Sequence, residues 1–288
     1  MRKLLAITCA LALSCGASAA AENKDTTTFH AYVDSDVCAR LMLGPITEAR
    51  IECSKKMYKS GSNLVIVRLN DNTVFEVNKT KLVKPYLGGF GKATGVAKAS
   101  AGTMKLESFM SELVTDIPAD APAQRLLDVR TYKAKTTDGL FEKIRHELAM
   151  IPYITTFDFI SFTMIGNDVI LTGWTVRDTN RGDAYHRVKS IPGVGNIVNN
   201  IEILPLGDAD MAIRASARAA LAQQLGQYFW SNGSDIKIVV KNGNIILLGS
   251  VQTKEDSDLA TIKCNSAPMS FAVMNLLRIE PPAPKNKG

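Results

Sequence analysis

The second half of the chain repeats itself, and this repeat constrains the fold more than any other feature. At a constant offset of 76 residues, residues 170–173 (ILTG) match residues 246–249 (ILLG), and the register continues without a gap to Pro205 and Pro281. Other matched pairs are Ala184 with Ala260, Pro192 with Pro268, Asn199 with Asn275 and Ile203 with Ile279. A gapless register over this length predicts two copies of one supersecondary unit.

Within each copy, the spacing of apolar residues predicts a helix, a β-hairpin, a second helix and a final strand. Two helices on one face of a three-stranded sheet bury a single core, which defines an α+β fold of order αββαβ. In the first copy, the first helix is marked by Leu140, Ile144, Leu148 and Ile151, and the hairpin spans residues 157–164 and 169–175. The second helix begins at Asp178, and the last strand covers residues 197–204. In the second copy, Ile213, Ala217, Leu221 and Leu225 mark the first helix, residues 236–240 and 245–251 the hairpin, residues 254–265 the second helix, and residues 271–279 the last strand.

Both copies resemble BON domains, whose usual pattern is an aliphatic strand ending in Gly, a polar helix with a central Ala, a Gly-Val turn and an Asn in the last strand. The first copy has residues 171–173 (LTG), Ala184, residues 191–194 (IPGV) and Asn199; the second has residues 247–249 (LLG), Ala260 and Asn275, with Met269 and Ser270 in place of Gly-Val. The resemblance covers residues 138–205 and 210–281. It implies small non-catalytic binding modules of the bacterial envelope, associated with phospholipid or other envelope ligands.

Three glycines of this pattern are expected to have structural roles. Gly173 and Gly249 end the aliphatic strands, and Gly193 precedes the last strand of the first copy. Glycine lacks a Cβ atom, so it permits sharp turns and a close approach of neighbouring backbone. None of the pattern residues is chemically reactive, so the pattern predicts packing and not catalysis.

Residues 28–108 are expected to form a small β-rich domain. The segments 64–69 and 73–77 predict one hairpin, and the segments 92–99 and 103–107 predict a second one. A helix capped by Thr47 is expected between the first strand and these hairpins. The following residues, 109–137, contain Pro118 and Pro122 without a sustained apolar period and are expected to be a linker.

The β-rich domain resembles a family of small secreted domains of unknown function with an OB-like outline. Four segments carry the resemblance: residues 32–38 with Cys38, Cys53, residues 65–67 with 75–77, and residues 91–96. Members of that family often carry another cysteine close to the second one, and this chain lacks it. The resemblance implies a small barrel, and such barrels bind oligonucleotides or oligosaccharides on one face.

The first 21 residues have the composition of a secretory signal peptide. Arg2 and Lys3 precede an apolar run over residues 4–13 and a small-residue cleavage site at residues 17–21. We therefore expect a periplasmic or secreted protein with no transmembrane segment in the mature chain. Cys15 leaves open an alternative, in which the leader ends at a lipid-attachment site and the protein is an outer-membrane lipoprotein.

Three cysteines remain after removal of the leader. In an oxidising compartment, Cys38 and Cys53 can form a disulfide that closes a loop of about 15 residues and contributes on the order of 3 kcal/mol to stability. Cys264 is then left over, and we expect a buried free thiol on a helix.

The sequence contains no pattern typical of an enzyme, a metal site or a cofactor site. His30, His146 and His186 lie in different segments, and neither a HExxH, a GxSxG nor a phosphate-loop motif occurs. The net charge of +6 becomes +4 without Arg2 and Lys3, which is too weak to predict nucleic-acid binding. The lysines at 79, 81, 84 and 92 are interleaved only with Tyr86 and Phe90, so a solvated basic edge is expected there.

Residues 228–230 are the candidate site for ligand binding. Tyr228, Phe229 and Trp230 follow the first helix of the second copy, and three consecutive aromatic residues cannot all face one core. Aromatic residues of this kind suit the interface between membrane and water. The lipid-docking hypothesis adds the nearby cations Arg214, Arg218 and Lys237; in the competing interpretation, two of the rings pack between the copies, as is expected of Trp174 in the first copy.

The sequence therefore predicts a non-enzymatic envelope binding protein. The expected partner is an anionic phospholipid surface, with a role in envelope integrity or stress response. The alternative is an adaptor that binds a cell-wall polymer, a small solute or a protein partner without lipid. Salt-sensitive and headgroup-dependent association would distinguish the first hypothesis from the second.

Overall fold

The computed structural model describes residues 26–42, 46–112, 129–130, 139–230, 233–268 and 270–280. The expected signal peptide lies outside the described residues, as does most of the expected linker. Among the described helices, none has the length and apolar character needed to cross a bilayer.

The N-terminal region is a closed five-stranded barrel with strand order β1-β2-β3-β5-β4, in which β3 and β5 run parallel and the other pairs antiparallel. The expected hairpins are present, and β5 continues past residue 108 to Glu112. The elements are β1 (Thr26–Ser35), α1 (Asp36–Leu41), α2 (Glu48–Lys59), β2 (Leu64–Arg68), β3 (Val74–Val77), α3 (Thr80–Val83), η1 (Lys84–Tyr86), β4 (Phe90–Lys98), η2 (Ala99–Ala101) and β5 (Thr103–Glu112).

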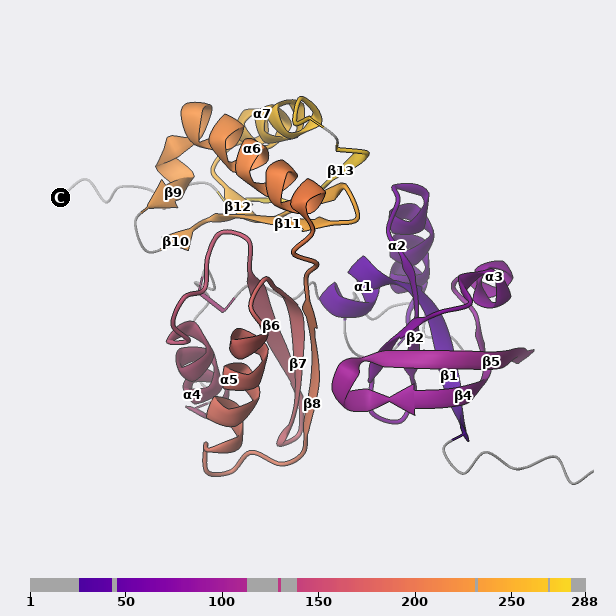
Figure 1. The fold of residues 1–288 in the computed structure, drawn as a ribbon. Helices are drawn as coiled ribbons and strands as arrows, with labels where there is room; N and C mark the ends of the chain where they lie inside the picture. Colours follow the sequence, from indigo (N-terminus) through magenta and orange to yellow (C-terminus); the bar gives the residue numbers. More distant parts are fainter. Residues whose placement is uncertain are drawn as a thin grey trace, which may run out of the picture.

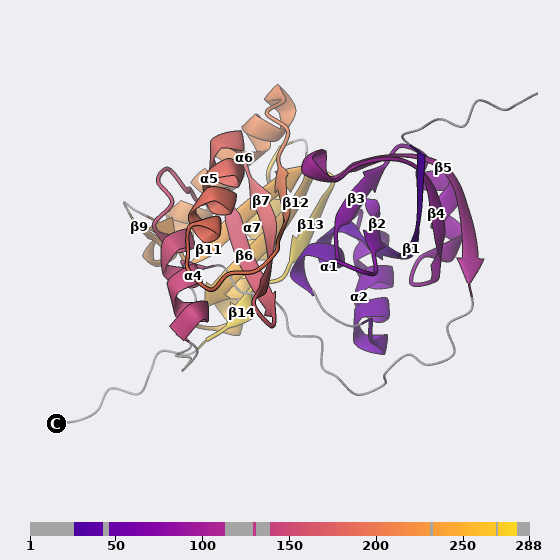
Figure 2. The ribbon, with the colours of Figure 1, turned by 90° about the horizontal axis from the view of Figure 1, so that it is seen from below.

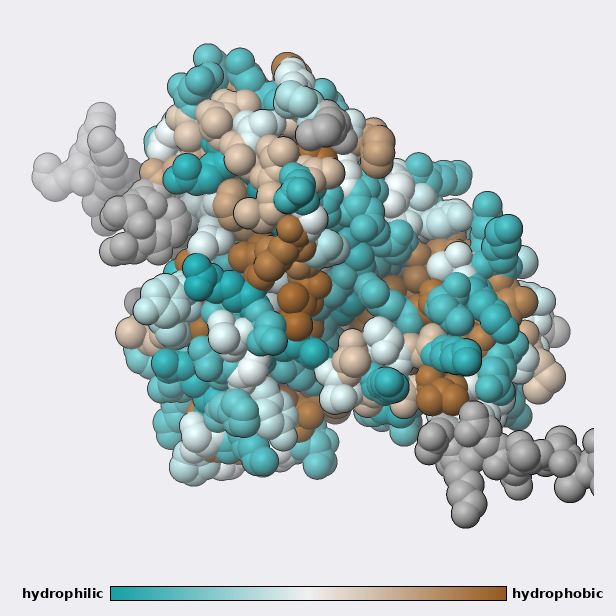
Figure 3. Space-filling view, viewed as in Figure 1, coloured by the Kyte–Doolittle hydropathy of each residue, from teal (hydrophilic) through white to brown (hydrophobic). Residues whose placement is uncertain are grey.

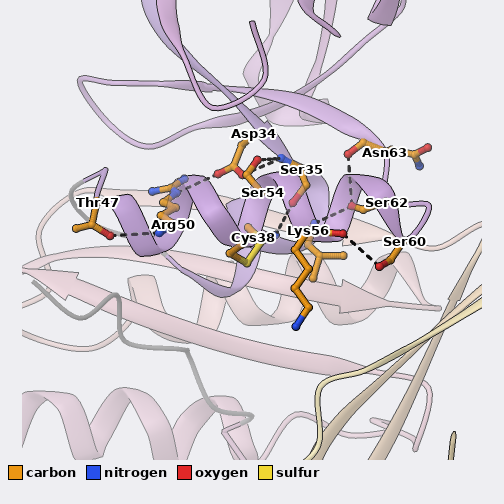
Figure 4. Close-up of a disulfide and its surroundings, with 12 residues drawn as sticks. Asp34, Ser35, Cys38, Thr47, Arg50, Ser54, Lys56, Ser60, Ser62 and Asn63 are labelled. Carbon is orange, nitrogen blue, oxygen red and sulfur yellow. Dashed lines mark hydrogen bonds and ion pairs between the residues drawn. A yellow bond between two sulfur atoms is a disulfide. The ribbon is translucent and has the colours of Figure 1, made fainter. Parts of the chain in front are cut away.

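Two helices precede β2, and a disulfide joins them. Thr47 caps α2 as expected, by accepting a hydrogen bond from the backbone N–H of Arg50 at 3.3 Å. Cys38 of α1 is bonded to Cys53 of α2, which confirms the expected pairing. Figure 4 shows that the disulfide lies close to a buried ion pair, in which Arg50 Nε donates to Asp34 Oδ2 at 2.9 Å. This pair fixes α2 against the end of β1.

Both copies of the repeat adopt the expected αββαβ order, with the two helices of each copy on one face of its sheet (Figure 1). In each sheet the first two strands are antiparallel and the last strand is parallel to the central one. The first copy consists of α4 (Gly139–Ala149), β6 (Phe159–Ile165), β7 (Asp168–Thr175), α5 (Asp178–Lys189) and β8 (Ile197–Ile203). The second consists of α6 (Asp208–Gln224), η3 (Gly226–Tyr228), β9 (Phe229–Trp230), β10 (Gly233–Ser234), β11 (Ile236–Lys241), β12 (Asn244–Val251), α7 (Lys254–Asn265), β13 (Ala272–Asn275) and β14 (Arg278–Ile279).

The second copy differs from the expected pattern in two places. Its last strand, expected to be continuous over residues 271–279, is divided into β13 and β14, which both pair with β12. A two-stranded sheet, β9 with β10, also forms between its first helix and its hairpin. The first copy has no counterpart of this small sheet among its described residues.

The repeated glycines allow close contact between strands. Gly173 and Gly249 have φ angles of 119° and 96°, and a Cβ atom at these positions would lie 2.0 Å from Phe159 O and 1.9 Å from Asp235 O. Any side chain would therefore clash with the backbone of the neighbouring strand. Gly193 also has a positive φ angle, 96°, at the turn before β8.

The repeated asparagines connect the last strand of each copy to its second helix. Asn199 Nδ2 donates to Arg181 O of α5 at 3.0 Å, while its Oδ1 accepts from Ile201 N at 3.1 Å. Asn275 makes the equivalent contacts in the second copy, to Ser257 O at 2.9 Å and from Leu277 N at 3.0 Å. Each side chain therefore satisfies a donor of its own strand and also fixes the helix above it.

The three units share one hydrophobic core at their junction. In Figures 1 and 2, α1 lies at the boundary between the barrel and the two copies. Trp174, expected to be buried, is 0% exposed there and packs against Phe159. Its buried members in the barrel region are Val37, Cys38, Leu41 and Met57. The first copy contributes Phe159, Trp174 and, just after β8, Leu204. The second copy contributes Val239, Ile246, Leu248 and Met274.

Candidate binding surfaces

Three of the six residues expected to dock on lipid, Arg214, Tyr228 and Lys237, are buried. Arg214 is 1% exposed, and its guanidinium donates to Pro205 O at 2.9 Å and Val240 O at 2.7 Å. Lys237 is also 1% exposed. Tyr228 is 2% exposed, and its hydroxyl donates to Asp256 at 2.6 Å. These side chains support the fold from within and do not form an exposed cluster.

Burial of Lys237 has a cause outside the second copy. The chain before β6 runs along the edge of β11, where Ile238 N donates to Thr156 O at 2.8 Å and Thr156 Oγ1 donates to Ile236 O at 2.9 Å. Lys237 Nζ then reaches Thr155 O at 3.5 Å. A strand that alternates apolar and polar residues usually exposes the polar face, but here the first copy covers it.

Of the other three residues, Arg218 and Phe229 retain some solvent exposure. Phe229 is half-buried against the core of the second copy. Trp230 belongs to β9, and its side chain lies outside the described residues. Arg218 is exposed on α6.

Arg218 belongs to a largely uncharged face of α6, which we call the α6 outer face. It comprises Met211, Ala215, Arg218 and Ala219, all exposed, together with Leu206 of the short segment between β8 and α6. Leu206 is 61% and Met211 47% exposed. Figure 3 shows a hydrophobic area where the short segment between β8 and α6 joins the two copies, and a mildly hydrophobic area over α6. The spacing of i, i+4, i+7 and i+8 places these helical residues on one side of the helix.

A second surface, on the barrel, is strongly basic. We call it the lysine surface, and its members are Lys55, Lys56 and Lys59 of α2 and Lys79, Lys81 and Lys84 of the segment after β3, all exposed. Lys84 Nζ lies 5.9 Å from the centre of the Tyr58 ring, so the two segments are neighbours. Within the described part of the chain, none of the six forms an ion pair. Lys92, expected in the same cluster, instead pairs with Glu112 at 3.2 Å.

Five charged side chains meet where the barrel and both copies join, and we call this cluster the charged junction. Asp36 and Arg40 come from α1, Glu76 from β3, Glu202 from β8 and Lys241 from β11. The Lys241 ammonium lies 2.5 Å from carboxylate oxygens of both Glu76 and Glu202 and 3.3 Å from Asp36. Arg40 contacts Asp36 at 2.8 Å and Glu202 at 3.0 Å.

The charged junction has three carboxylates and two cations, so its members titrate differently. Burial, followed by repulsion from Asp36, raises the pKa of Glu202 to about 7. Burial would also raise the pKa values of Asp36 and Glu76, but the cations outweigh it and leave both pKa values lowered. Burial opposes the charge on Lys241, yet the surrounding carboxylates raise its pKa.

The carboxylates of the charged junction resemble a metal-ligand set. One oxygen each from Asp36, Glu76 and Glu202 lies within 4.8 Å of the others. The ammonium of Lys241, however, lies between them and supplies the positive charge that a cation would bring. The arrangement therefore joins three structural units and does not favour a metal site.

A groove of about 610 Å³ separates the barrel from the first copy. The first copy contributes α5 and β8, and the barrel contributes the turn after β2 together with η2. A second cavity of about 140 Å³ shares Arg181, Asn199 and Ile203 with the groove and is also lined by Arg40, Glu76 and Glu202. The groove therefore leads from the surface toward the charged junction.

The repeat geometry and its glycines and asparagines define a tandem of αββαβ modules, and comparison with known families agrees. Residues 137–205 and 209–281 match the family described as BON domain. The chain therefore contains two BON domains in tandem.

Comparison with other known proteins adds little. No curated protein matches the chain. Among solved structures, it is similar to CdsD, a structural protein of the type III secretion system of Chlamydia trachomatis, at 14% identity and a TM-score of 0.19, over 49% of this chain and 92% of that one. A structure of the CdsD C-terminal domain matches with the same identity and TM-score, over 51% of this chain and 100% of that one. Similarity at this level supports no inference about function.

Proposed function

We propose that the protein is a non-enzymatic envelope binding protein that associates peripherally with a phospholipid membrane through the α6 outer face. The observation that carries this proposal is the exposure of Leu206 and Met211 beside a single cation, Arg218. An amphipathic helix of this kind can bury its apolar side chains at the headgroup boundary while an arginine contacts lipid phosphate. Phe229 and Trp230 follow α6 in the chain, and the proposal extends the same contact to them.

An exported location is part of this proposal. The Cys38–Cys53 disulfide supports an oxidising compartment, and BON domains are associated with the envelope. Together with the leader composition, these features support a periplasmic or secreted protein. The barrel order β1-β2-β3-β5-β4 supports an OB-like N-terminal domain.

The lysine surface favours a second function, an adaptor that binds an anionic cell-wall polymer without lipid. Six exposed lysines from two neighbouring segments create a positive field that no carboxylate neutralises by an ion pair in the described part of the chain. A repeating polyanion can contact several of them at once. The two candidate functions therefore use different surfaces, and separate variants can distinguish them.

Vesicle flotation tests the lipid proposal. Residues 22–288 are mixed with neutral or anionic vesicles at low and moderate salt, as wild type and as the double variant Leu206→Glu, Met211→Glu. We expect flotation with anionic vesicles, reduced by salt and lost in the variant, because added carboxylates oppose both insertion and headgroup contact. A Phe229→Ala, Trp230→Ala variant measures the contribution of β9.

The matched control is Ile262→Glu, Phe271→Glu, which adds the same charge at positions of the second BON domain that are 61% and 82% exposed. This control should float like the wild type. Equal flotation of the α6 variant, or no flotation at all, contradicts the lipid proposal. Binding to a purified anionic cell-wall polymer that is lost in Lys56→Glu, Lys59→Glu, Lys81→Glu would then favour the adaptor.

A further inference from the structure

The groove between the barrel and the first BON domain has the properties of a ligand site. Its volume of about 610 Å³ lies within the range of about 300–1,000 Å³ typical of small-molecule sites, which often form between domains. Ile197, Val198, Ile203 and Tyr185 contribute apolar lining. Ile203 remains 41% exposed, so no other part of the described chain covers this end of the groove.

Arg181 supplies a positive charge that is incompletely neutralised. One terminal amino group of its guanidinium donates to Ser100 O across the groove. Its Nε is buried and has no hydrogen-bond partner among the described residues. Burial and the neighbouring charge of Arg40 lower the pKa of Arg181, and only Asp178 opposes this effect.

The remaining charged groups of the groove do not neutralise Arg181 by contact. Arg68 is already paired with Asp71 at 2.6 Å. Asp178 is exposed at the start of α5 and forms no ion pair among the described residues. An anionic group brought by a ligand would pair with the Arg181 guanidinium and restore the charge balance.

We propose that this groove binds a single-chain anionic amphiphile. Its carboxylate or phosphate head pairs with the Arg181 guanidinium, and its alkyl chain lies on Ile197, Val198 and Ile203. The site takes one molecule and is separate from the α6 outer face, so it goes beyond the membrane contact proposed above. The head could belong to a free amphiphile, to a bilayer lipid or to an inorganic anion, and these sources give different results.

Gly182 offers a way to block the groove without disturbing the fold. It lies in α5, lines the groove and has no atom within 4 Å of a Cβ added there. Leucine is a better helix former than glycine, so Gly182→Leu should fold. The matched control is Gly139→Leu at the start of α4, where an added Cβ also meets nothing within 4 Å.

Isothermal titration of residues 22–288 with dodecyl phosphate, below its micelle concentration, tests the proposal. We expect one site per chain, weakened about 10- to 100-fold in Arg181→Gln because a charge-assisted hydrogen bond is lost. Gly182→Leu should abolish binding. Arg187→Gln, on the same helix and paired with Glu147 at 3.1 Å, and Gly139→Leu should bind like the wild type.

Further probes identify the source of the head. Two results overturn the proposal. One is binding of dodecanol with the same affinity as dodecyl phosphate, and the other is unchanged binding of dodecyl phosphate by both Arg181→Gln and Gly182→Leu. Inorganic phosphate binding as tightly as dodecyl phosphate overturns the role of the apolar lining. Loss of vesicle flotation in Gly182→Leu would assign the head to a bilayer lipid, whereas normal flotation would assign it to a free amphiphile. The α6 variant should retain dodecyl phosphate binding, so failure of either proposal leaves the other testable.

Discussion

At the scale of single residues, the repeated glycines make the most demanding contacts. Gly173 combines a φ angle of 119° with a backbone oxygen 2.0 Å from the position of a Cβ atom. We expect Gly173→Ala to lower the free energy of unfolding by about 3 kcal/mol, because backbone strain and a clash with an immobile oxygen add together. Urea denaturation followed by circular dichroism measures this change.

Gly182→Ala is the matched control for this prediction. Its helical position has no neighbour within 4 Å of an added Cβ. Removing a helical glycine should therefore raise the free energy of unfolding by about 0.5–1 kcal/mol. If both variants changed stability by the same amount, the close approach at Gly173 would have no special cost.

At the scale of elements, the disulfide joins α1 to α2, and α1 lies in the shared core. Cys38 and Cys53 are separated by 15 residues, so a bond between them removes about 3 kcal/mol of chain entropy from the unfolded state. We expect reductant to lower the free energy of unfolding by about this amount. The measurement is urea denaturation with and without dithiothreitol.

Cys264 provides the control because it is a buried free thiol whose pKa burial raises to about 12. Cys264→Ala should respond to dithiothreitol as the wild type does. The Cys38→Ser, Cys53→Ser variant should not respond. A response that persists in this double variant would show that reductant acts elsewhere.

Helices, strands and their caps could be predicted where the sequence signal lies within or next to the element itself. The helix and strand periods of both BON domains, the Thr47 cap and the Cys38–Cys53 pair were all predicted and are present. The burial of Lys237 could not be predicted, because the segment that covers it belongs to the other BON domain. Local spacing shows which residues share a strand face, but not what packs on that face.

At the scale of the whole molecule, the charged junction was not predicted because its members come from four elements distant in sequence. The only local signal is a charge within an apolar strand, as with Glu76 in β3 and Glu202 in β8. Such charges are usually solvent-facing. Here the assembly of three units buries Glu202 and brings Glu76, which stays partly exposed, into contact with Lys241, so the cluster exists only when the barrel and both BON domains are in place.

Stability should therefore depend on pH through Glu202. Its pKa rises from 4.5 to about 7 in the folded protein, so between these values the folded state retains a proton that the unfolded state releases. Raising the pH through this window lowers the free energy of unfolding, by about 1–3 kcal/mol in total. Asp36 and Glu76 have lowered pKa values, and the stability they contribute is present above their unfolded values and lost only in more acidic solution.

The substitution Glu202→Gln isolates this effect, because glutamine has a similar shape but cannot ionise. We expect the wild type to lose stability from pH 5 to pH 7.5 and the variant to change much less over the same range, as measured by urea denaturation at each pH. Glu147→Gln, which removes a partly exposed carboxylate paired with Arg187, should keep the wild-type slope. An unchanged slope in Glu202→Gln would mean that Arg40 and Lys241 hold Glu202 ionised throughout, and that the excess negative charge of the junction is balanced without a proton.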